Sequence, residues 1–149
     1  MRIALYQPDQ AGNVGTILRL AACLGVGADL IEPCGFAFAD RALKRAGMDY
    51  LDIAALTRHA DWRAFEAQCA GRIVLLTTGG DTALPAARFE ANDTLLLGSE
   101  SSGVPHAVHD RAALRVRIPL VREARSLNIA VAAGIALGEA LRQTDGWPR

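Results

Sequence analysis

The sequence predicts an α/β protein with a mainly parallel sheet that helices cover on both faces. Apolar segments of strand length alternate with helical segments along the chain, and several strands are apolar throughout. Strands of this kind are typical of parallel sheets buried on both sides. The chain has 149 residues, of which 51% are hydrophobic and 21% charged, which predicts one folded domain over residues 1–149.

Apolar spacing and helix-ending residues define the elements of the first half. The apolar run over residues 2–6 predicts a strand. Apolar residues recur at helical spacing over residues 12–24, which predicts a helix that Gly25 ends. The next predicted elements are a strand over residues 28–31, a short helix that Asp40 caps and Gly47 ends, a strand over 50–56, and a helix from Asp61 to Cys69.

The second half continues the alternation. Strands are predicted over residues 72–77, 94–97 and 114–118, a short helix over 104–112, and a last helix that Ser126 caps and that runs to about Gln143. Ligands of such sheets bind outside the carboxyl ends of the strands. The loops after Leu76, Leu97 and Ile118 are therefore expected to form a ligand site.

Charge and cysteine content limit the class of protein. The formal net charge is zero, which argues against a partner held by bulk charge alone. Cys23, Cys34 and Cys69 are odd in number and form no C-x-x-C pair, so we expect reduced, buried thiols in a cytoplasmic protein. No apolar run approaches the roughly 18 residues of a membrane-spanning helix, and the first residues form a strand pattern rather than a signal peptide.

Common phosphate and metal motifs are weak or missing. The glycines of residues 24–30 lack the third glycine of a dinucleotide-binding fingerprint and lie between a helix and a strand, which favours a helix end and a turn. There is no Walker A sequence. His106, His109 and Asp110 are neighbours in the sequence, but two histidines three residues apart are weak grounds for a metal, and we predict none.

Three segments with small and polar residues lie next to predicted strands, and the first two contain glycine. They are residues 13–19 (NVGTILR), 97–103 (LGSESSG) and 118–130 (IPLVREARSLNIA). Glycine lets another backbone or a ligand approach closely. Each segment alone also fits a structural interpretation, because Asn13 and Ser126 can cap helices, residues 97–103 can form an ordinary turn, and Arg19 can face solvent.

Together and in this order, the three segments resemble the SPOUT class of methyltransferases. The patterns of that class, N-x-G-x-x-x-R, L-x-G-x-E-x-x-G and I-P-[ML] followed by S-L-N, are met by Asn13, Gly15 and Arg19, by Leu96, Gly98, Glu100 and Gly103, and by Ile118, Pro119, Leu120, Ser126, Leu127 and Asn128. Residues 5–8, 31–36, 45–50, 57–59 and 76–78 further resemble the subfamily that methylates the 2′-hydroxyl of cytidine or uridine 34 in tRNA.

The resemblance implies a cofactor and a topology that periodicity does not predict. It implies a deep trefoil knot in the carboxyl-terminal part of the sheet, although general topology rules argue against knots. It implies S-adenosylmethionine as the cofactor, whose pressure on the backbone would explain the small residues of the loop 98–103. The implied cofactor-binding residues are Leu76, Thr77, Gly98, Glu100, Gly103, Ile118, Leu120, Ser126, Leu127 and Asn128.

The resemblance also implies a homodimer in which the partner subunit completes each active site. The last predicted helix fits this, because it is apolar on almost every side and such a helix should be buried all round. Gly134 and Gly138 would let another helix approach closely. Packing of this helix within one subunit is the alternative.

The implied reaction transfers a methyl group to a ribose 2′-hydroxyl without a metal. Arg19 is expected to orient the hydroxyl or hold the adjacent phosphate, because a guanidinium stays protonated. Ser126 and Asn128 are expected to position the hydroxyl or the cofactor, and Glu100 to anchor its loop. Basic residues are expected to contact a tRNA anticodon stem-loop, with solvated surface charge as the alternative; they are Arg41, Lys44, Arg45, Arg58, His59, Arg122 and Arg125.

Some positions depart from the subfamily pattern. Relatives of this kind commonly carry Arg or Lys at Ser102, Lys near Gly80, Ser-Asn at Ala130 and Val131, and Tyr at Gly138. These departures leave open a 2′-O-methyltransferase for another tRNA or rRNA nucleotide, or a non-catalytic knotted RNA-binding domain. A flavodoxin-like nucleotide binder is a more distant alternative.

Overall fold

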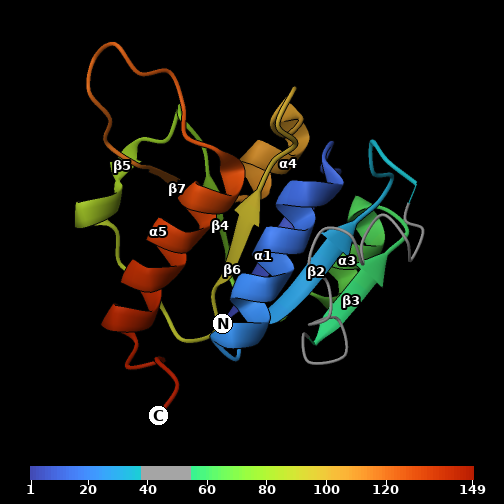
Figure 1. Ribbon diagram of the computed structural model, residues 1–149, viewed down its shortest axis with the longest axis horizontal. Coiled ribbons are helices and arrows are strands. Elements are labelled where there is room, and N and C mark those ends of the chain that lie inside the picture. Colours follow the sequence, from blue (N-terminus) through green and yellow to red (C-terminus); the bar gives the residue numbers. More distant parts are fainter. Residues whose placement is uncertain (38–54) are drawn as a thin grey trace.

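The computed structural model describes residues 1–37 and 55–149. A seven-stranded sheet runs through the molecule in the order β3-β2-β1-β6-β4-β7-β5, and all of its described pairs are parallel (Figure 1). Its strands are β1 (Arg2–Tyr6), β2 (Gly27–Ile31), β3 (Leu56–His59), β4 (Ile73–Leu76), β5 (Thr82–Ala83), β6 (Thr94–Leu97) and β7 (Leu114–Arg117). The predicted parallel sheet is confirmed.

Helices cover both faces of the sheet, as the apolar strands predicted. They are α1 (Ala11–Cys23), α3 (Trp62–Gln68), α4 (His106–Arg111) and α5 (Ile129–Gln143), with the short 3-10 helix η1 (Leu84–Ala86). Successive side chains of a strand point to opposite faces. Ile3 and Leu5 of β1 accordingly pack in one core with α1 and α5, while Ala4 and Tyr6 pack in a second core with α3 and α4.

Most predicted elements of the described residues are present, with shifted ends. Gly25, at φ +65°, follows α1 as expected, and Asp61 caps α3 by accepting from the Ala64 backbone N–H at 2.8 Å. The strand predicted over residues 50–56 lies largely outside the described residues, and β3 runs from Leu56 to His59. β5 and η1 were not predicted. The short helix expected after Asp40, with Arg41, Lys44 and Arg45, lies outside the described residues.

A buried polar cluster joins the first three strands. Arg2 Nε donates to Asp29 Oδ2 at 2.6 Å, and Asp29 Oδ1 lies 2.8 Å from His59 Nε2. His59 is 3% exposed and its ring packs edge-on against Phe65. The predicted RNA contact of His59 is therefore wrong, because β3 extends to His59 and carries this side chain into the core.

The cysteines are free but not all buried. Cys23 is exposed, while Cys34 and Cys69 are half-buried. The expectation of buried thiols is thus wrong for Cys23, which comes at the last residue of α1. Burial, followed by the nearby charge of Glu32, raises the pKa of the Cys34 thiol to about 11. Cys34 is therefore a thiol rather than a thiolate at neutral pH.

Within the two described ranges, no helix is long and apolar enough to cross a membrane.

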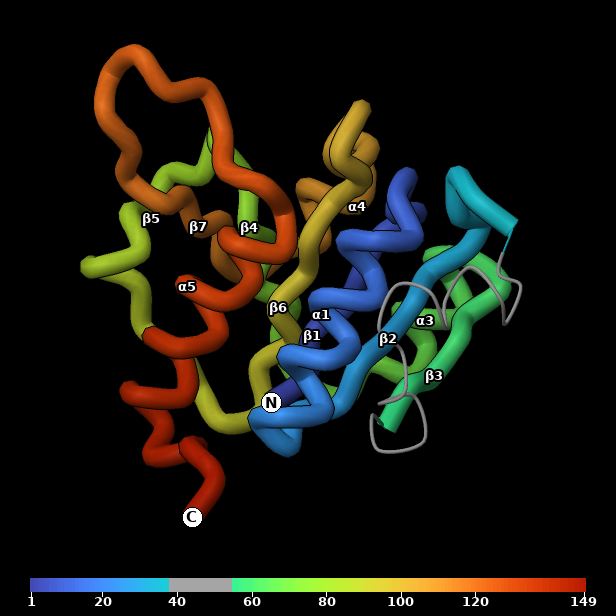
Figure 2. Tube along the Cα trace, in the orientation of Figure 1, coloured from blue at the N-terminus to red at the C-terminus, as the bar shows by residue number. Residues whose placement is uncertain are grey.

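The segment between β7 and α5 is long and irregular. Figure 2 shows it arching out past β5 before it returns to the start of α5. Thr77 N–H, just after β4, donates to Val116 O of β7 at 2.9 Å, so the turn after β4 is fixed beside β7. The expected trefoil knot in this part of the chain stays a prediction.

Gly80 lies where the turn between β4 and β5 presses against β7. A β-carbon at Gly80 would lie 2.6 Å from the carbonyl carbon of Val116 and 2.7 Å from the nitrogen of Arg117. A β-carbon at Gly79, by contrast, would have no heavy atom within 4 Å apart from its own chain neighbours and would lie in open space. The subfamily pattern has a lysine near Gly80, and in this turn a side chain fits at Gly79 and not at Gly80.

We expect Gly80→Ala to lower the free energy of unfolding by about 1–3 kcal/mol, because backbone atoms on both sides must move to admit the methyl group. Gly79→Ala, its matched control, should change it by less than about 0.5 kcal/mol. Urea denaturation of both variants measures the difference. Equal effects of the two substitutions would show that the close approach at Gly80 does not exist.

Candidate active site

One cleft opens at the edge of the sheet where β4, β6 and β7 end. Parallel strands bring their carboxyl ends to the same edge, so the loops after these three strands meet there. The cleft has a volume of about 710 Å³. All of the predicted cofactor-binding residues line it: Leu76, Thr77, Gly98, Glu100, Gly103, Ile118, Leu120, Ser126, Leu127 and Asn128.

Sequence reasoning missed several residues that line the same cleft. They are Gln10, Asn13, Leu75, Thr78, Ser99, Val104, Val116, Arg117, Ala124, Ile129 and Ala132, together with Arg125, which was expected to contact RNA. Asn13 belongs to the first motif, so a signal for it was present. Gln10 and Ala132 carry no such signal, because only the packing of α1 against α5 brings them to the cleft.

The loop between Gly98 and Gly103 closes on itself. Ser99 and Gly103 exchange two backbone hydrogen bonds of 2.9 Å. A β-carbon at Gly98 would lie 2.5 Å from the carbonyl carbon of Gly103, and Gly103 itself has φ +66°, a conformation that favours glycine. Both glycines are thus required by the loop's own backbone, so the pressure of a cofactor is not needed to explain them.

Glu100 ties this loop to the beginning of α1. Its Oε2 accepts from the backbone N–H of Asp9 at 2.7 Å, and its Oε1 accepts from Nδ2 of Asn13 at 2.9 Å. Both carboxylate oxygens are therefore occupied by donors. This arrangement anchors the loop, as expected of Glu100, and makes the carboxylate a poor general base.

Asn128 extends the connection to α5. Its Nδ2 donates to Oδ1 of Asn13 at 3.1 Å. Its Oδ1 accepts from the backbone N–H of Ala130 at 2.9 Å, so Asn128 caps α5. Two predictions were wrong here: Ser126 is not the cap of the last helix, and Asn13 lies inside α1 instead of capping it. The three motifs nevertheless meet through their own side chains.

The remaining predicted residues lie apart from this cleft. Arg19 is exposed on α1, six residues after Asn13, or about 9 Å further along the helix, and does not line the cleft. Arg122 is exposed on the segment between β7 and α5. Arg58 is exposed on β3 and forms an ion pair with Glu32.

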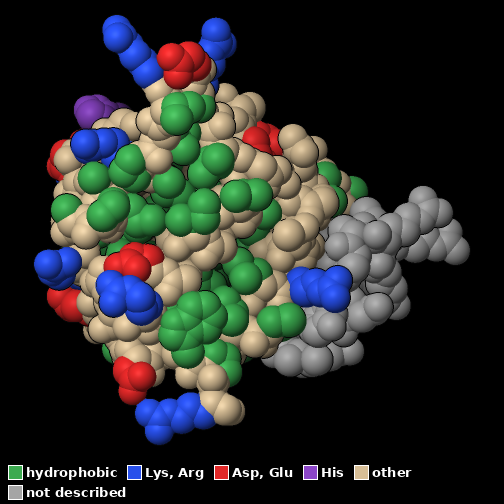
Figure 3. All heavy atoms as spheres, turned by 60° about the vertical axis from the view of Figure 1, so that its left-hand side comes forward, with side chains coloured by type: hydrophobic (Ala, Val, Ile, Leu, Met, Phe, Trp, Pro, Cys, Tyr) green, Lys and Arg blue, Asp and Glu red, His purple; other side chains and the backbone are tan. Residues whose placement is uncertain are grey.

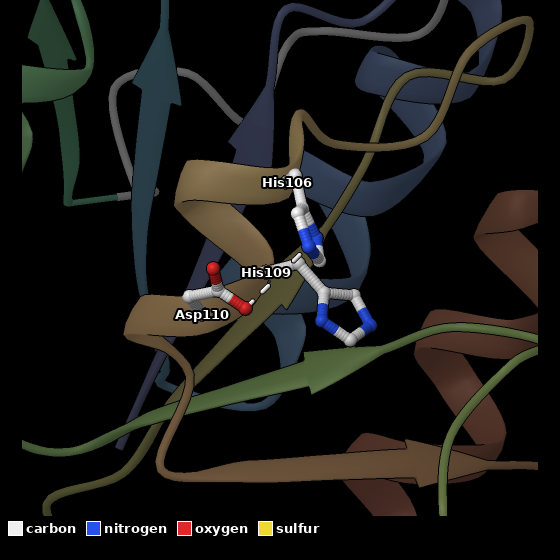
Figure 4. A group of neighbouring side chains, drawn as sticks. All are labelled: His106, His109 and Asp110. Carbon is white, nitrogen blue, oxygen red and sulfur yellow. Dashed lines mark ion pairs between the residues drawn. The ribbon is translucent and has the colours of Figure 1, made fainter.

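The side chains of His106, His109 and Asp110 do come together on α4 (Figure 4), with candidate ligand atoms all within 4.8 Å of one another. Arg115 Nε donates to Nδ1 of His109 at 3.0 Å and brings a positive charge to the cluster. The side chains of His106 and Asp110 are 90% and 62% exposed. We assign no metal to this group.

Comparison with known proteins places the chain in a family. The sequence model of the SpoU rRNA methylase family matches residues 1–138. The chain belongs to this family. The resemblance to methyltransferases that the motifs indicated is thus confirmed.

Members with full-length similarity to this SpoU-family chain carry a common name. This chain is 51% identical to the tRNA (cytidine(34)-2'-O)-methyltransferase of Ancylobacter novellus, over 100% of this chain and 96% of the relative. Identity to the protein of that name from Beijerinckia indica is 55%, over 95% and 90% of the two chains. The corresponding protein of Escherichia coli K12 is 42% identical, over 99% and 96%.

Solved structures of the SpoU family share the fold. One that gives structural insights into the 2-OH methylation of C/U34 on tRNA matches with a TM-score of 0.89 and 42% identity, covering 95% of this chain and 94% of that chain. The SpoU methyltransferase AviRb from Streptomyces viridochromogenes, in complex with the cofactor AdoMet, matches with a TM-score of 0.85 and 26% identity. It covers 96% of this chain and 57% of that chain.

We expect Asn128→Ala to lower the free energy of unfolding by about 1 kcal/mol, because it removes the cap of α5. Ser126→Ala should leave it within about 0.5 kcal/mol of the original value, since Ser126 is exposed and lies outside the helix. Thermal and urea denaturation measure both. A larger loss for the serine variant would contradict the assignment of the cap.

Proposed function

We propose that this chain is an S-adenosylmethionine-dependent methyltransferase that modifies the ribose 2′-hydroxyl of the wobble nucleotide, cytidine or uridine 34, of tRNA. In this proposal the chain forms a single domain over residues 1–149, and the enzyme works in the cytoplasm as a homodimer. The choice of substrate is supported by the match at 42–55% identity, over nearly whole chains, to proteins named for this reaction. The cleft that gathers the three motifs supports the chemistry.

The residues of the cleft fit the cofactor. Its volume of about 710 Å³ lies in the range of roughly 300–1,000 Å³ that small-ligand sites occupy. Leu76, Leu97 and Ile118 give apolar contacts for a purine ring, and the segment after Ile118, which has no helix or strand before Ile129, offers backbone groups to the adenine edge. This mixture of apolar walls and few polar groups is typical of cofactor pockets.

The chemistry that the bound cofactor supplies is a methyl group on a positively charged sulfur. Positive charge disappears from the sulfur as the methyl group leaves, so the protein's task is chiefly to align the reacting atoms and exclude water. Ser126 and Asn128 lie at the cleft, where they position the hydroxyl or the cofactor. Asn128 already uses Oδ1 and one Nδ2 hydrogen internally, so it retains one N–H for this purpose.

Arg19 holds the substrate ribose and its adjacent phosphate in this proposal. Its guanidinium stays protonated, so orientation and charge fit it better than proton abstraction. Arg19 does not line the cleft of its own subunit. It lies next to Leu20, which contacts α5: a β-carbon at Gly134 would lie 3.8 Å from Cδ2 of Leu20. Placement of Arg19 in the partner's cleft reconciles its position with this role.

The apolar surface of α5 supports the homodimer. Val131 and Ile135 of α5 and Trp147 beyond it are 51%, 43% and 49% exposed. We call these three residues the α5 patch; Figure 3 shows hydrophobic side chains gathered on this face of the molecule. Gly134 and Gly138 are already approached by Leu20 and Trp147 of the same chain. The partner helix is therefore expected to contact the α5 patch rather than the glycines.

Exposed basic residues at the cleft and elsewhere on the surface are expected to contact the anticodon stem-loop. Arg125 lines the cleft and Arg122 lies on the same segment. Arg58 lies on β3, where its charge is partly neutralised by an ion pair with Glu32. Arginine forks match phosphate geometry, and the net charge of zero makes such local contacts the main attraction for RNA.

Incubated with radiolabelled S-adenosylmethionine and total tRNA from a strain lacking this enzyme, the purified protein should label the 2′-oxygen of a pyrimidine at position 34. Arg19→Ala should lower the rate by about 100-fold, since misplacing a reacting group by an ångström costs that much. Its binding of S-adenosylmethionine should not change. Digestion and mapping of the labelled nucleotide, with calorimetry for binding, measure these results.

Arg149→Ala is the matched control, because Arg149 is an exposed arginine at the chain end, paired with Asp145. It should keep full activity. Label at another tRNA or rRNA nucleotide would contradict the wobble position while keeping the chemistry. Binding of S-adenosylmethionine with no labelled RNA would favour the non-catalytic RNA-binding alternative.

Ile135→Asp should convert the dimer to a monomer at micromolar concentration, because it places a charge in the centre of the α5 patch. Ala107→Asp adds the same charge to an exposed residue of α4, whose helix packs on the opposite face of the sheet, and should leave the dimer intact. Sedimentation velocity distinguishes the two states. An Ile135→Asp protein that remains dimeric would place the interface elsewhere.

A further inference from the structure

Two reciprocal hydrogen bonds join the turn after β1 to the loop after β6. The backbone N–H of Asp9 donates to Oε2 of Glu100 at 2.7 Å. In return, the backbone N–H of Ser101 donates to Oδ2 of Asp9 at 2.8 Å. Each segment therefore offers a carboxylate to the backbone of the other.

We propose that Asp9 is a positioning residue of the methyl transfer, whose carboxylate holds the Gly98–Gly103 loop of the cleft in register with the start of α1. This inference rests on the proposed function. Asp9 itself does not line the cleft. It acts through Ser101 and Glu100, and no contact of Asp9 with substrate or cofactor is needed.

The reciprocal pair fixes the loop better than either bond alone. A single hydrogen bond lets two segments rotate about it, whereas two bonds at neighbouring residues remove that freedom. Bonds to an ionised acceptor are also shorter and stronger than neutral ones. The side-chain and backbone hydrogen bonds from Ser101 lower the pKa of Asp9, so its carboxylate is ionised at neutral pH.

The segment after β2 supports the turn from another side. The backbone N–H of Gly35 donates to Pro8 O at 2.9 Å. A β-carbon at Gly35 would lie 3.0 Å from Cα of Asp9 and 3.2 Å from its carbonyl oxygen. The turn that carries Asp9 is thus held between Gly35 and the cleft loop, which leaves it little room to shift.

Displacement of the turn that carries Asp9 would alter both the cofactor side of the cleft and the placement of Arg19. Asn13, four residues later, donates to Glu100 and accepts from Asn128. Arg19 follows on the same helix. Loss of the Asp9 carboxylate is therefore expected to loosen the cofactor side of the cleft and the placement of Arg19 together, so that both cofactor affinity and turnover fall.

The test compares Asp9→Ala, Asp9→Asn and Asp61→Ala in the full chain. Asp61 is the matched control, because its carboxylate also accepts a backbone N–H at 2.8 Å but caps α3, away from the cleft. Calorimetry measures the Kd for S-adenosylmethionine, the tRNA assay measures kcat and KM, and thermal unfolding measures Tm.

Asp9→Ala should raise the Kd for S-adenosylmethionine about tenfold, the effect of one lost hydrogen bond to a charged acceptor, and should lower kcat at saturating cofactor. Asp9→Asn keeps an oxygen in the same place and should restore most of both. Asp61→Ala should lower Tm and leave Kd and kcat unchanged.

Two results would overturn the role of Asp9. One is an Asp9→Ala protein with the Kd and kcat of the wild type. The other is a change in Tm alone, like that of Asp61→Ala, which would make the contact merely structural. A wild-type protein that fails to bind S-adenosylmethionine would overturn the proposed function, and the assignment of Asp9 to methyl transfer with it, so the two failures are distinguishable.

Discussion

The carboxylate of Glu100 joins parts of the chain that are far apart in sequence. Its oxygens accept from the backbone of Asp9 and the side chain of Asn13, at 2.7 and 2.9 Å. A carboxylate withdrawn from water is costly unless donors surround it. The turn after β1, the start of α1 and the loop after β6 therefore take their positions together. Asn128 adds the start of α5 to the same set.

The parallel sheet makes this meeting possible. β4, β6 and β7 lie side by side and run in the same direction, so the loops that follow them open at one edge. Glycines then allow the close approaches that the loops need. Gly80 lets the turn after β4 lie against β7, and Gly98 lets its own loop close on Gly103. The cleft is thus a consequence of strand direction combined with the absence of side chains at two points.

These contacts indicate which residues shape the cleft and which are available for the substrate. Glu100, Asn13 and Asn128 use most of their hydrogen-bonding capacity on one another and on the backbone. They hold the cleft in shape and leave little for proton transfer. Arg19 lies outside the cleft, on helix α1, which packs against the helix that carries the α5 patch. A reaction that depends on alignment, with the substrate held by a second subunit, fits both facts.

Alternation of apolar segments was enough to predict the parallel sheet and the helices on both faces, because burial on two sides leaves a clear mark on composition. The three motifs were enough to predict some of the residues that line one cleft, since each motif lies at the end of a predicted strand or soon after it. Capping and burial were less predictable. Ser and Asn both favour helix caps, and only the start of α5 at Ile129, with the Ala130 backbone N–H donating to Oδ1 of Asn128, assigns the cap to Asn128.

The sequence by itself determined the fold class, the family and the ten predicted cofactor-binding residues of the cleft, because these depend on local periodicity and on motif spacing. Only the tertiary structure decided that His59 is buried against Asp29, that Cys23 is exposed, and that Gly98 serves its own loop. The contact of Asp9 with the cleft loop is also visible only in the tertiary structure. Its partner Ser101 is 92 residues away in the chain, and no local pattern records a contact between segments that folding alone brings together.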